Sequence, residues 1–247
     1  MTTFPRALIE VTIAAPADEV WQALRDKDRL AQWFGWDTDS LGAEIDFIFF
    51  GDHARPDAAT RTLRFDGDPD YFEVEPRGDN SCVVRFVRPA PTADHNWEDI
   101  FEDVTQGWIA FVQQLKFMMD RHRGDTRRTL FLSGSPLKAN APLAAKAFGL
   151  PATGAAGTDY KLTAPMGDAL AGRVWHRGPH QLGLTVEGAG DGLLVVMDRP
   201  PGEKYPRGHS QVILTTYGLS DRAYDELAAR WKTWWSERFD NKMPGCA

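Results

Sequence analysis

Two long helical segments constrain the fold of this chain most. Each follows a run of short strand-like segments and lies at the end of one half of the sequence. Residues 103–122 contain no proline, and their apolar side chains recur at helical spacing. Residues 220–239 form a second such segment, with Ser220 placed as an N-cap. A sheet followed by a helix with one broad apolar face can bury both apolar surfaces by packing against that helix. We therefore expect an α+β chain with two units in tandem.

The first half begins with a strand and two short helices. Alternating apolar residues predict a strand over 7–13, which Pro16 ends before a short helix over 16–24. A second short helix is expected over 28–34. Strands are then expected over 41–50, 60–65, 71–75 and 81–88, separated by turn signals rich in Gly, Asp and Pro.

The second half repeats this order loosely. Its predicted strands are 130–132, 171–175, 181–186, 192–197 and 211–216, with a short helix over 141–148 capped by Asn140 and a loop over 149–157. Trp108 and Trp231 occupy similar positions in the two closing helices, which indicates a duplication. A polar stretch at Gly124 marks the boundary, so the expected domains are 1–124 and 125–247.

Composition excludes several classes of protein. The 247 residues carry a net charge of −7, which argues against nucleic-acid binding as the main activity. The chain has no apolar run of the roughly 18 residues that a membrane span needs, and no leader pattern at its start. Two cysteines, Cys82 and Cys246, are too few for a disulfide framework. We expect a cytoplasmic protein that binds neither nucleic acid nor membrane.

Motifs for catalysis or metal binding are weak. His176 and His180 stand four residues apart, but Gly178-Pro179 lies between them and forbids a regular helix, so we expect a loop with two exposed histidines. The segment Ser133-Gly134-Ser135 lacks the spacing of a nucleophile elbow, and Cys82 is expected to be a small buried hydrophobe. The sequence therefore indicates no metal, no cofactor and no catalytic residue.

Three charged residues lie among apolar neighbours in predicted strands: Asp46, Glu73 and Arg85. We expect each to face water, because an unpaired charge in the interior is costly. If an acid and Arg85 pointed inward together, they could orient a ligand carbonyl or supply acid–base chemistry. Enzymatic activity is thus left open, and the absence of activity is favoured.

The first half resembles a known superfamily. The residues that carry the resemblance are Ile9 to Ile13, Pro16, Val20-Trp21, Leu24, Leu30, Trp33-Phe34, and then Gly107-Trp108 and Leu115 in the closing helix. Over residues 6–123 they resemble the START-like (SRPBCC) superfamily, within the branch named after the activator of the heat-shock-protein-90 ATPase. Residues 126–240 resemble a degenerate second copy, through Ser135-Pro136 and the Trp-rich final helix.

The resemblance implies a helix-grip fold, in which a curved antiparallel sheet wraps a long C-terminal helix. A sheet bent around one helix leaves enclosed space between them, so a ligand cavity is expected there. One wall would come from the helix and the other from either Ile45, Phe47 and Phe49 or Ile48 and Phe50, because both sets are apolar. The candidate cavity residues are Trp33, Phe34, Phe47, Phe49, Arg85, Trp108, Phe111, Val112 and Leu115.

Three functions are consistent with these expectations. The first is binding of a small hydrophobic or aromatic molecule in the cavity. The second is a protein-interaction module that assists a chaperone ATPase or forms a homodimer. Trp235 is relevant to it, because Trp234 and Trp235 point about 100° apart on a helix and one must leave the main stripe. We expect that ring to pack between the halves, with a subunit or client contact as the alternative. The third is a cyclase- or dehydratase-like enzyme.

Overall fold

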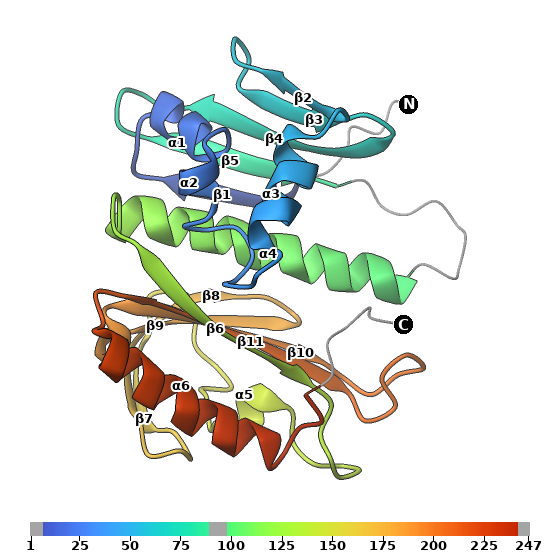
Figure 1. Cartoon of the computed structure of the whole chain (residues 1–247), viewed down its shortest axis with the longest axis vertical. Coiled ribbons are helices and arrows are strands. Elements are labelled where there is room, and N and C mark those ends of the chain that lie inside the picture. The colour runs from blue at the N-terminus through green and yellow to red at the C-terminus, as the bar shows by residue number, and fades with distance from the viewer. Residues whose placement is uncertain (1–6, 89–97, 242–247) are drawn as a thin grey trace. The chain divides into compact units, whose positions relative to one another are not determined.

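The computed structural model describes residues 7–88 and 98–241, with side chains over 9–88 and 103–241. The chain divides into two compact units, residues 1–124 (the first domain) and 125–247 (the second domain), and the division falls where the sequence places the linker (Figure 1). Each domain is an antiparallel sheet followed by a long helix. The fold is α+β, with the helix-grip order of elements in both domains.

The first domain opens with a strand, three helices and a meander. Its sheet has the order β1-β5-β4-β3-β2, so the first strand pairs with the last and β2 is an edge. The helix α4 closes the domain. The elements are β1 (Ala7–Ile13), α1 (Ala17–Ala23), α2 (Lys27–Leu30), α3 (Leu41–Phe50), β2 (Ala54–Asp57), β3 (Thr62–Phe65), β4 (Asp68–Pro76), β5 (Cys82–Val87) and α4 (Glu98–Arg121).

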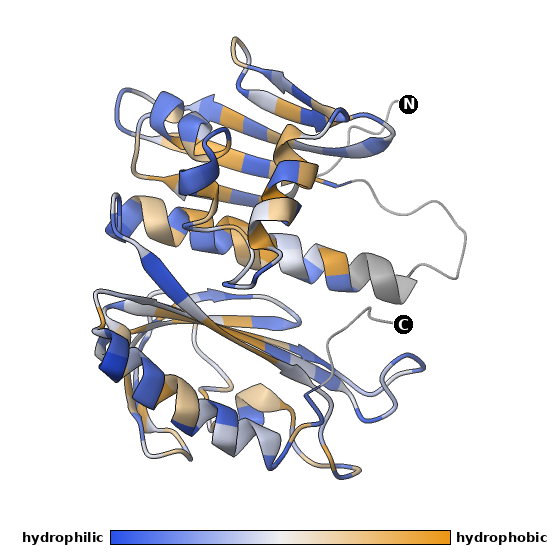
Figure 2. Cartoon of the chain, in the orientation of Figure 1, coloured by the Kyte–Doolittle hydropathy of each residue, from blue (hydrophilic) through white to orange (hydrophobic). Residues whose placement is uncertain are grey.

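One face of this sheet packs against α4. Alternation along β4 buries Phe72 and Val74, and Figure 2 shows apolar and polar residues alternating along the strands of this sheet. From α4, Val112 and Leu115 are fully buried in the same core cluster. The sequence-predicted core face of the long helix is therefore confirmed at these two positions.

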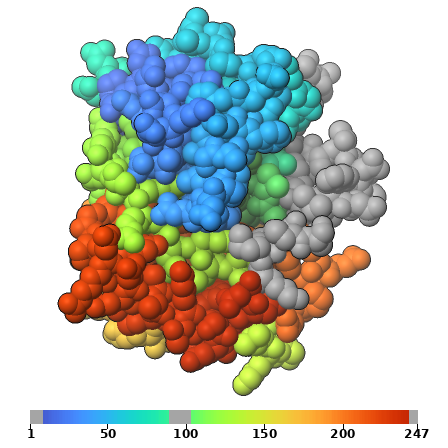
Figure 3. Space-filling model, in the orientation of Figure 1, coloured from blue at the N-terminus to red at the C-terminus, as the bar shows by residue number. Residues whose placement is uncertain are grey.

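The segment Leu41–Phe50 is a helix, so the predicted strand is wrong. Its buried residues Leu41, Ile45 and Phe49 recur every four residues and join the core, as one face of a helix requires. Ser40 precedes the helix, and its hydroxyl lies 2.6 Å from Glu44 Oε1. The segment from α2 to α3 forms part of the visible surface of the first domain (Figure 3). The sequence alone leaves open which of two strand faces points inward, but in the helix the buried residues Leu41, Ile45 and Phe49 form one face.

The second domain has a six-stranded sheet of order β6-β11-β10-β9-β8-β7. The strands predicted for this domain all lie within observed strands. Two edge strands were not predicted, β7 here and β2 in the first domain, because most of their residues are polar or exposed. The elements are β6 (Arg127–Gly134), α5 (Ala144–Ala147), β7 (Asp159–Thr163), β8 (Ala169–Arg177), β9 (Gln181–Val186), a 3-10 turn η2 (Glu187–Ala189), β10 (Gly192–Arg199), β11 (His209–Tyr217) and α6 (Asp221–Ser236).

The short helix α5 begins later than predicted, at Ala144 rather than 141. Asn140 does not cap it; this residue has φ +61°, which turns the chain. Instead the Asp198 carboxylate accepts hydrogen bonds from the backbone N–H groups of Ala144 (3.1 Å) and Ala145 (3.0 Å). A residue distant in sequence therefore satisfies the free N–H groups at the start of this helix.

The long helix α6 buries both of its adjacent tryptophans. Ser220 caps it as predicted, accepting from Ala223 N at 3.3 Å. Trp234 lies 4.7 Å from Phe148 between ring centroids, and Trp235 stacks on Phe239 at 3.9 Å. The prediction that Trp235 packs between the halves or at an interface is wrong, because the chain folds back after α6 and covers this ring within the second-domain core.

Within the described residues, no helix is long and apolar enough to cross a membrane.

Candidate ligand-binding site

Aromatic side chains from four regions of the first domain meet around Trp108 of α4. Its indole lies 4.6 Å from Phe86, 5.5 Å from Phe72, 5.8 Å from Phe34 and 6.0 Å from Phe111, measured between ring centroids. These spacings are those of attractive aromatic contacts. The ring cluster consists of Trp33, Phe34, Phe49, Phe72, Phe86, Trp108 and Phe111.

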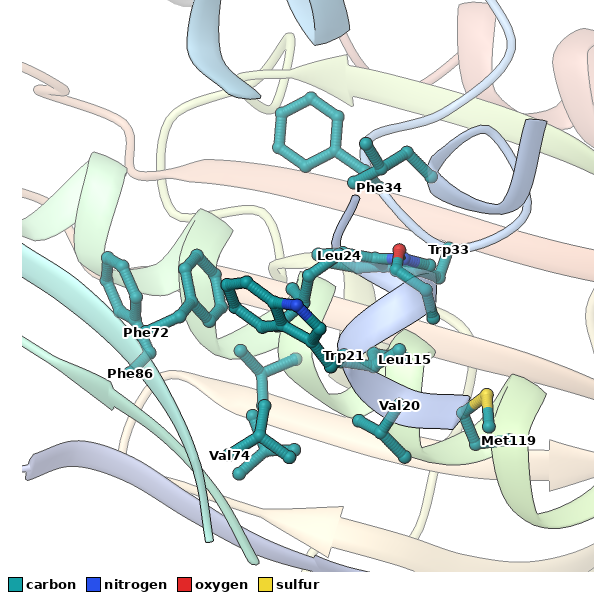
Figure 4. Close-up of a cluster of buried hydrophobic side chains, with 14 of the residues drawn as sticks. Val20, Trp21, Leu24, Trp33, Phe34, Phe72, Val74, Phe86, Leu115 and Met119 are labelled. Carbon is teal, nitrogen blue, oxygen red and sulfur yellow. The ribbon is translucent and has the colours of Figure 1, made fainter. Parts of the chain in front are cut away.

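The sheet and the short helices each supply one side of the ring cluster. Phe72 and Phe86 are directly paired across β4 and β5, and their rings lie 4.7 Å apart. In Figure 4 these two rings lie beside each other, with Trp33 and Phe34 on the segment that follows α2. Trp33 contacts Phe34 and Phe49, each at 6.0 Å and nearly perpendicular. Helix α3 thus contributes through Phe49.

Exposure differs across the ring cluster. Trp33, Phe34 and Phe49 are buried, as are Phe72 and Phe86, whereas Trp108 and Phe111 are only half-buried. The indole of Trp36, also half-buried, lies 6.2 Å from Phe111. The cluster therefore reaches the surface at Trp108 and Phe111. Partly exposed aromatic rings that contact buried rings can take up a planar apolar group.

Most of the candidate cavity residues predicted from the sequence meet in one core cluster. The seven that do so are Trp33, Phe34, Phe49, Trp108, Phe111, Val112 and Leu115. Phe47 and Arg85 do not. Phe47 is 70% exposed, because it lies half a turn from Phe49 on α3, where a strand would have placed both on one face.

Arg85 lies on the face of β5 opposite Val84 and Phe86, so it cannot line the interior. Its guanidinium bonds Glu75 and, at 2.6 Å, Glu10, which raises the pKa of Arg85 and lowers that of Glu75. Glu73 of β4 is paired directly with Arg85 of β5, and its carboxylate lies 3.7 Å from the guanidinium. The group forms a cross-strand ion network on the outer face.

Asp46 also points away from the core. It pairs with Lys27, and its side chain is 55% exposed. Together with Glu73 and Arg85, it lies where the sequence analysis expected it, outside the interior. These three residues therefore supply no polar group to the ring cluster.

His176 corrects a further expectation, since it is buried in β8 rather than exposed in a loop. Its Nε2 lies 3.0 Å from Gln181 Oε1, and burial lowers the pKa of His176 to about 4. Among the described residues, no group of three His, Cys, Asp or Glu side chains could hold a metal ion. Cys82 is a buried free thiol, as expected, and burial raises its pKa to about 11. Cys246 lies outside the described residues.

Sequence reasoning missed two features of the second domain. The first is a hollow of about 670 Å³ beside α5. The second is a contact between Ser133 and His209, whose Oγ and Nε2 atoms lie 3.0 Å apart. The other ring nitrogen of His209 lies 3.4 Å from Ser135 Oγ. Only the pairing of β6 with β11 brings these residues together, so no local sequence signal could have shown it.

The two domains define a class of protein, a chain with two helix-grip units in tandem. No family model and no curated protein matches the chain. Similar solved structures include the di-domain ARO/CYC BexL from the BE-7585A biosynthetic pathway, with 12% identity, a TM-score of 0.35 and coverage of 92% of this chain and 91% of that one.

Two further structures are similar over both domains. DynU16, from the dynemicin biosynthetic locus, has 20% identity and a TM-score of 0.28, with 92% of this chain and 94% of that chain covered. The di-domain ARO/CYC StfQ from the steffimycin biosynthetic pathway has 14% identity and a TM-score of 0.34, with 93% and 91% covered. None of the comparisons singles out the branch named after the activator of the heat-shock-protein-90 ATPase.

Proposed function

We propose that the first domain binds a small apolar molecule with an aromatic ring at the ring cluster. One observation carries this proposal: Trp108 and Phe111 stay half-buried although Val112 and Leu115 on the same helix are fully buried. Half-buried aromatic rings in contact with a buried aromatic cluster gain free energy when an apolar ligand covers their remaining exposed surface.

The ligand would be recognised by stacking and by removal of apolar surface from water. Each aromatic pair contributes about 0.5–1.5 kcal/mol beyond the area it buries. The charged residues singled out by the sequence, Asp46, Glu73 and Arg85, lie outside the cluster, so they give no support to a cyclase- or dehydratase-like reaction. A cyclase- or dehydratase-like reaction therefore stays a prediction from the sequence.

The interaction alternative has lost its main support. Its candidate anchor, Trp235, is fully buried and stacks on the ring of Phe239, so it cannot reach a client. A homodimer or a chaperone-related partner stays a prediction from the sequence.

A fluorescent probe and two matched variants test the proposal. N-phenylnaphthylamine, a neutral aromatic probe, should bind the intact protein, and Trp108→Ala should weaken its affinity about tenfold by removing the half-buried ring. Phe47→Ala removes an exposed ring from the same domain and should change the affinity by less than about twofold. Native mass spectrometry of freshly purified protein would reveal a ligand carried from the cell.

Phe111→Ala serves as the second variant if Trp108→Ala fails to fold, as judged by circular dichroism. Unchanged probe affinity in a folded variant of either residue would overturn the proposed site. Equal weakening by Phe47→Ala would do so too, because this ring lies outside the cluster.

A further inference from the structure

A second hollow lies in the second domain, beside the short helix α5. The α5 hollow, of about 670 Å³, is bounded by α5 with the loop that follows it, by the turn from β8 to β9, and by β10. A volume of this size is ordinary for a small-molecule site. It is separate from the ring cluster, which belongs to the first domain, so binding in the α5 hollow is independent of the proposed function.

The floor of the α5 hollow is apolar. Leu150, Leu182 and Val196 line it, and each is at most 7% exposed. All three also belong to the core cluster of the second domain, so their positions are fixed by packing on the side away from the hollow. A ligand with an apolar body would therefore meet a preformed surface.

Hydrogen bonds fix both walls of the α5 hollow. Arg177 donates through Nε to Gly154 O at 3.0 Å and through Nη2 to Pro151 O at 2.8 Å, and so fixes the loop after α5. On the opposite wall, Asp198 accepts from Ala144 N, from Ala145 N and, at 2.7 Å, from Ser210 Oγ. The loop after α5 and the start of α5 are therefore both held in place by hydrogen bonds beside the hollow. Such preorganisation lowers the cost of binding.

Basic groups outnumber acids around the hollow. Lys146, Arg177 and His180 line it, against the single carboxylate of Asp198. Asp198 already accepts three hydrogen bonds, two of them from the start of α5. Lys146 is exposed, and no ion pair of the described part of the chain involves it. The hollow therefore combines an apolar floor with a lysine available to an anion.

We propose that the α5 hollow binds a small amphipathic acid, with its apolar body on Leu150, Leu182 and Val196 and its carboxylate paired with Lys146. The size of the hollow admits a medium-chain acyl group or a single ring system. The charged end distinguishes this ligand from the neutral aromatic molecule assigned to the first domain.

Octanoate and octanol form a matched pair of probes, because they share most of their apolar chain and differ in charge. Calorimetric titration of the full chain at neutral pH should show octanoate binding at least about tenfold more tightly than octanol. Lys146→Glu should weaken octanoate about tenfold and leave octanol unchanged, since Lys146 is exposed and its replacement keeps the fold. Lys161→Glu, at an exposed position on β7 outside the hollow, makes the same change of net charge.

Methyl NMR locates the probe. Octanoate should shift the methyl signals of Leu150, Leu182 and Val196, and Trp108→Ala should leave its affinity within about twofold. The proposal is overturned if Lys146→Glu and Lys161→Glu weaken octanoate equally, if octanol binds as tightly as octanoate, or if these three methyl signals do not move. A loss of octanoate binding in Trp108→Ala would also overturn it and would place the acid at the ring cluster.

Discussion

The indole nitrogen of Trp33 lies 2.9 Å from the carbonyl oxygen of Ala23 and donates a buried hydrogen bond to it. Ala23 is the last residue of α1, and Trp33 follows α2, so the bond joins the ends of two short helices. Helices of this length have little stability of their own and depend on such tertiary contacts. The bond also orients the ring that contacts Phe34 and Phe49. The geometry of the ring cluster therefore depends partly on one polar contact.

Trp33→Phe should lower the free energy of unfolding by about 1–3 kcal/mol, because it keeps an apolar ring but leaves the Ala23 carbonyl buried without its donor. Urea unfolding of the full chain, followed by circular dichroism, measures the change. Trp36→Phe is the matched control at a half-buried position and should cost less than about 1 kcal/mol. Equal losses in the two variants would contradict a special role for the bond.

Phe47 and Phe49 distinguish the helix α3 from a strand in that segment. Phe49→Ala should cost about 3–5 kcal/mol, because this ring is fully buried. Phe47→Ala should change stability by less than about 0.5 kcal/mol, because its ring is mostly exposed. Thermal and urea midpoints of both variants provide the measurement. A strand would place the two rings on one face, so similar costs would refute the helical assignment.

The segment containing these rings shows where sequence reasoning fails. Leu41–Phe50 is rich in β-branched and aromatic residues, and its apolar positions fit both a period of two and a spacing of four. Packing of Leu41, Ile45 and Phe49 into one core decides in favour of the helix, and that core is formed by residues distant in sequence. Local pattern alone could not show this.

The long helices α4 and α6 were predictable because their local pattern is unambiguous. Their length and unbroken helical period leave no competing structure, so the burial of Val112 and Leu115 followed from sequence. The α5 hollow did not, because it requires Asp198 to meet the start of α5 across a long stretch of chain. Likewise, the burial of His176 depends on the turn that brings Gln181 beside it.

Gly183 allows the imidazole of His176 to lie directly against the neighbouring strand. A Cβ atom at position 183 would lie 2.2 Å from His176 Nδ1, and the buried ring has little room to move. Gly183→Ala should therefore lower stability by about 1–3 kcal/mol through overpacking. Gly188→Ala is the control: this glycine is exposed, and an added Cβ would come no closer than 3.6 Å to Ala169 O. Urea midpoints should separate the two variants clearly, and equal midpoints would contradict the close approach.

Burial of His176 makes the stability of the protein depend on pH. The pKa of His176 is about 4 in the folded protein, against an ordinary value of 6.5, because burial disfavours the charged ring. Below about pH 6.5 His176 becomes protonated in the unfolded chain but stays neutral in the folded chain. The contribution of this group is therefore complete above that pH and is lost as the pH falls toward about 4, at roughly 1.4 kcal/mol per pH unit.

His176→Phe isolates this effect, because it keeps a ring over Gly183 but cannot titrate. The variant should be less stable at neutral pH, since Gln181 loses the contact with Nε2. Between about pH 6.5 and 5, however, the wild type should lose roughly 2 kcal/mol more than the variant. Urea unfolding of both proteins across this range provides the measurement, and carboxylates elsewhere contribute equally to both. Parallel pH profiles would show that His176 is protonated as readily in the folded chain as in the unfolded one.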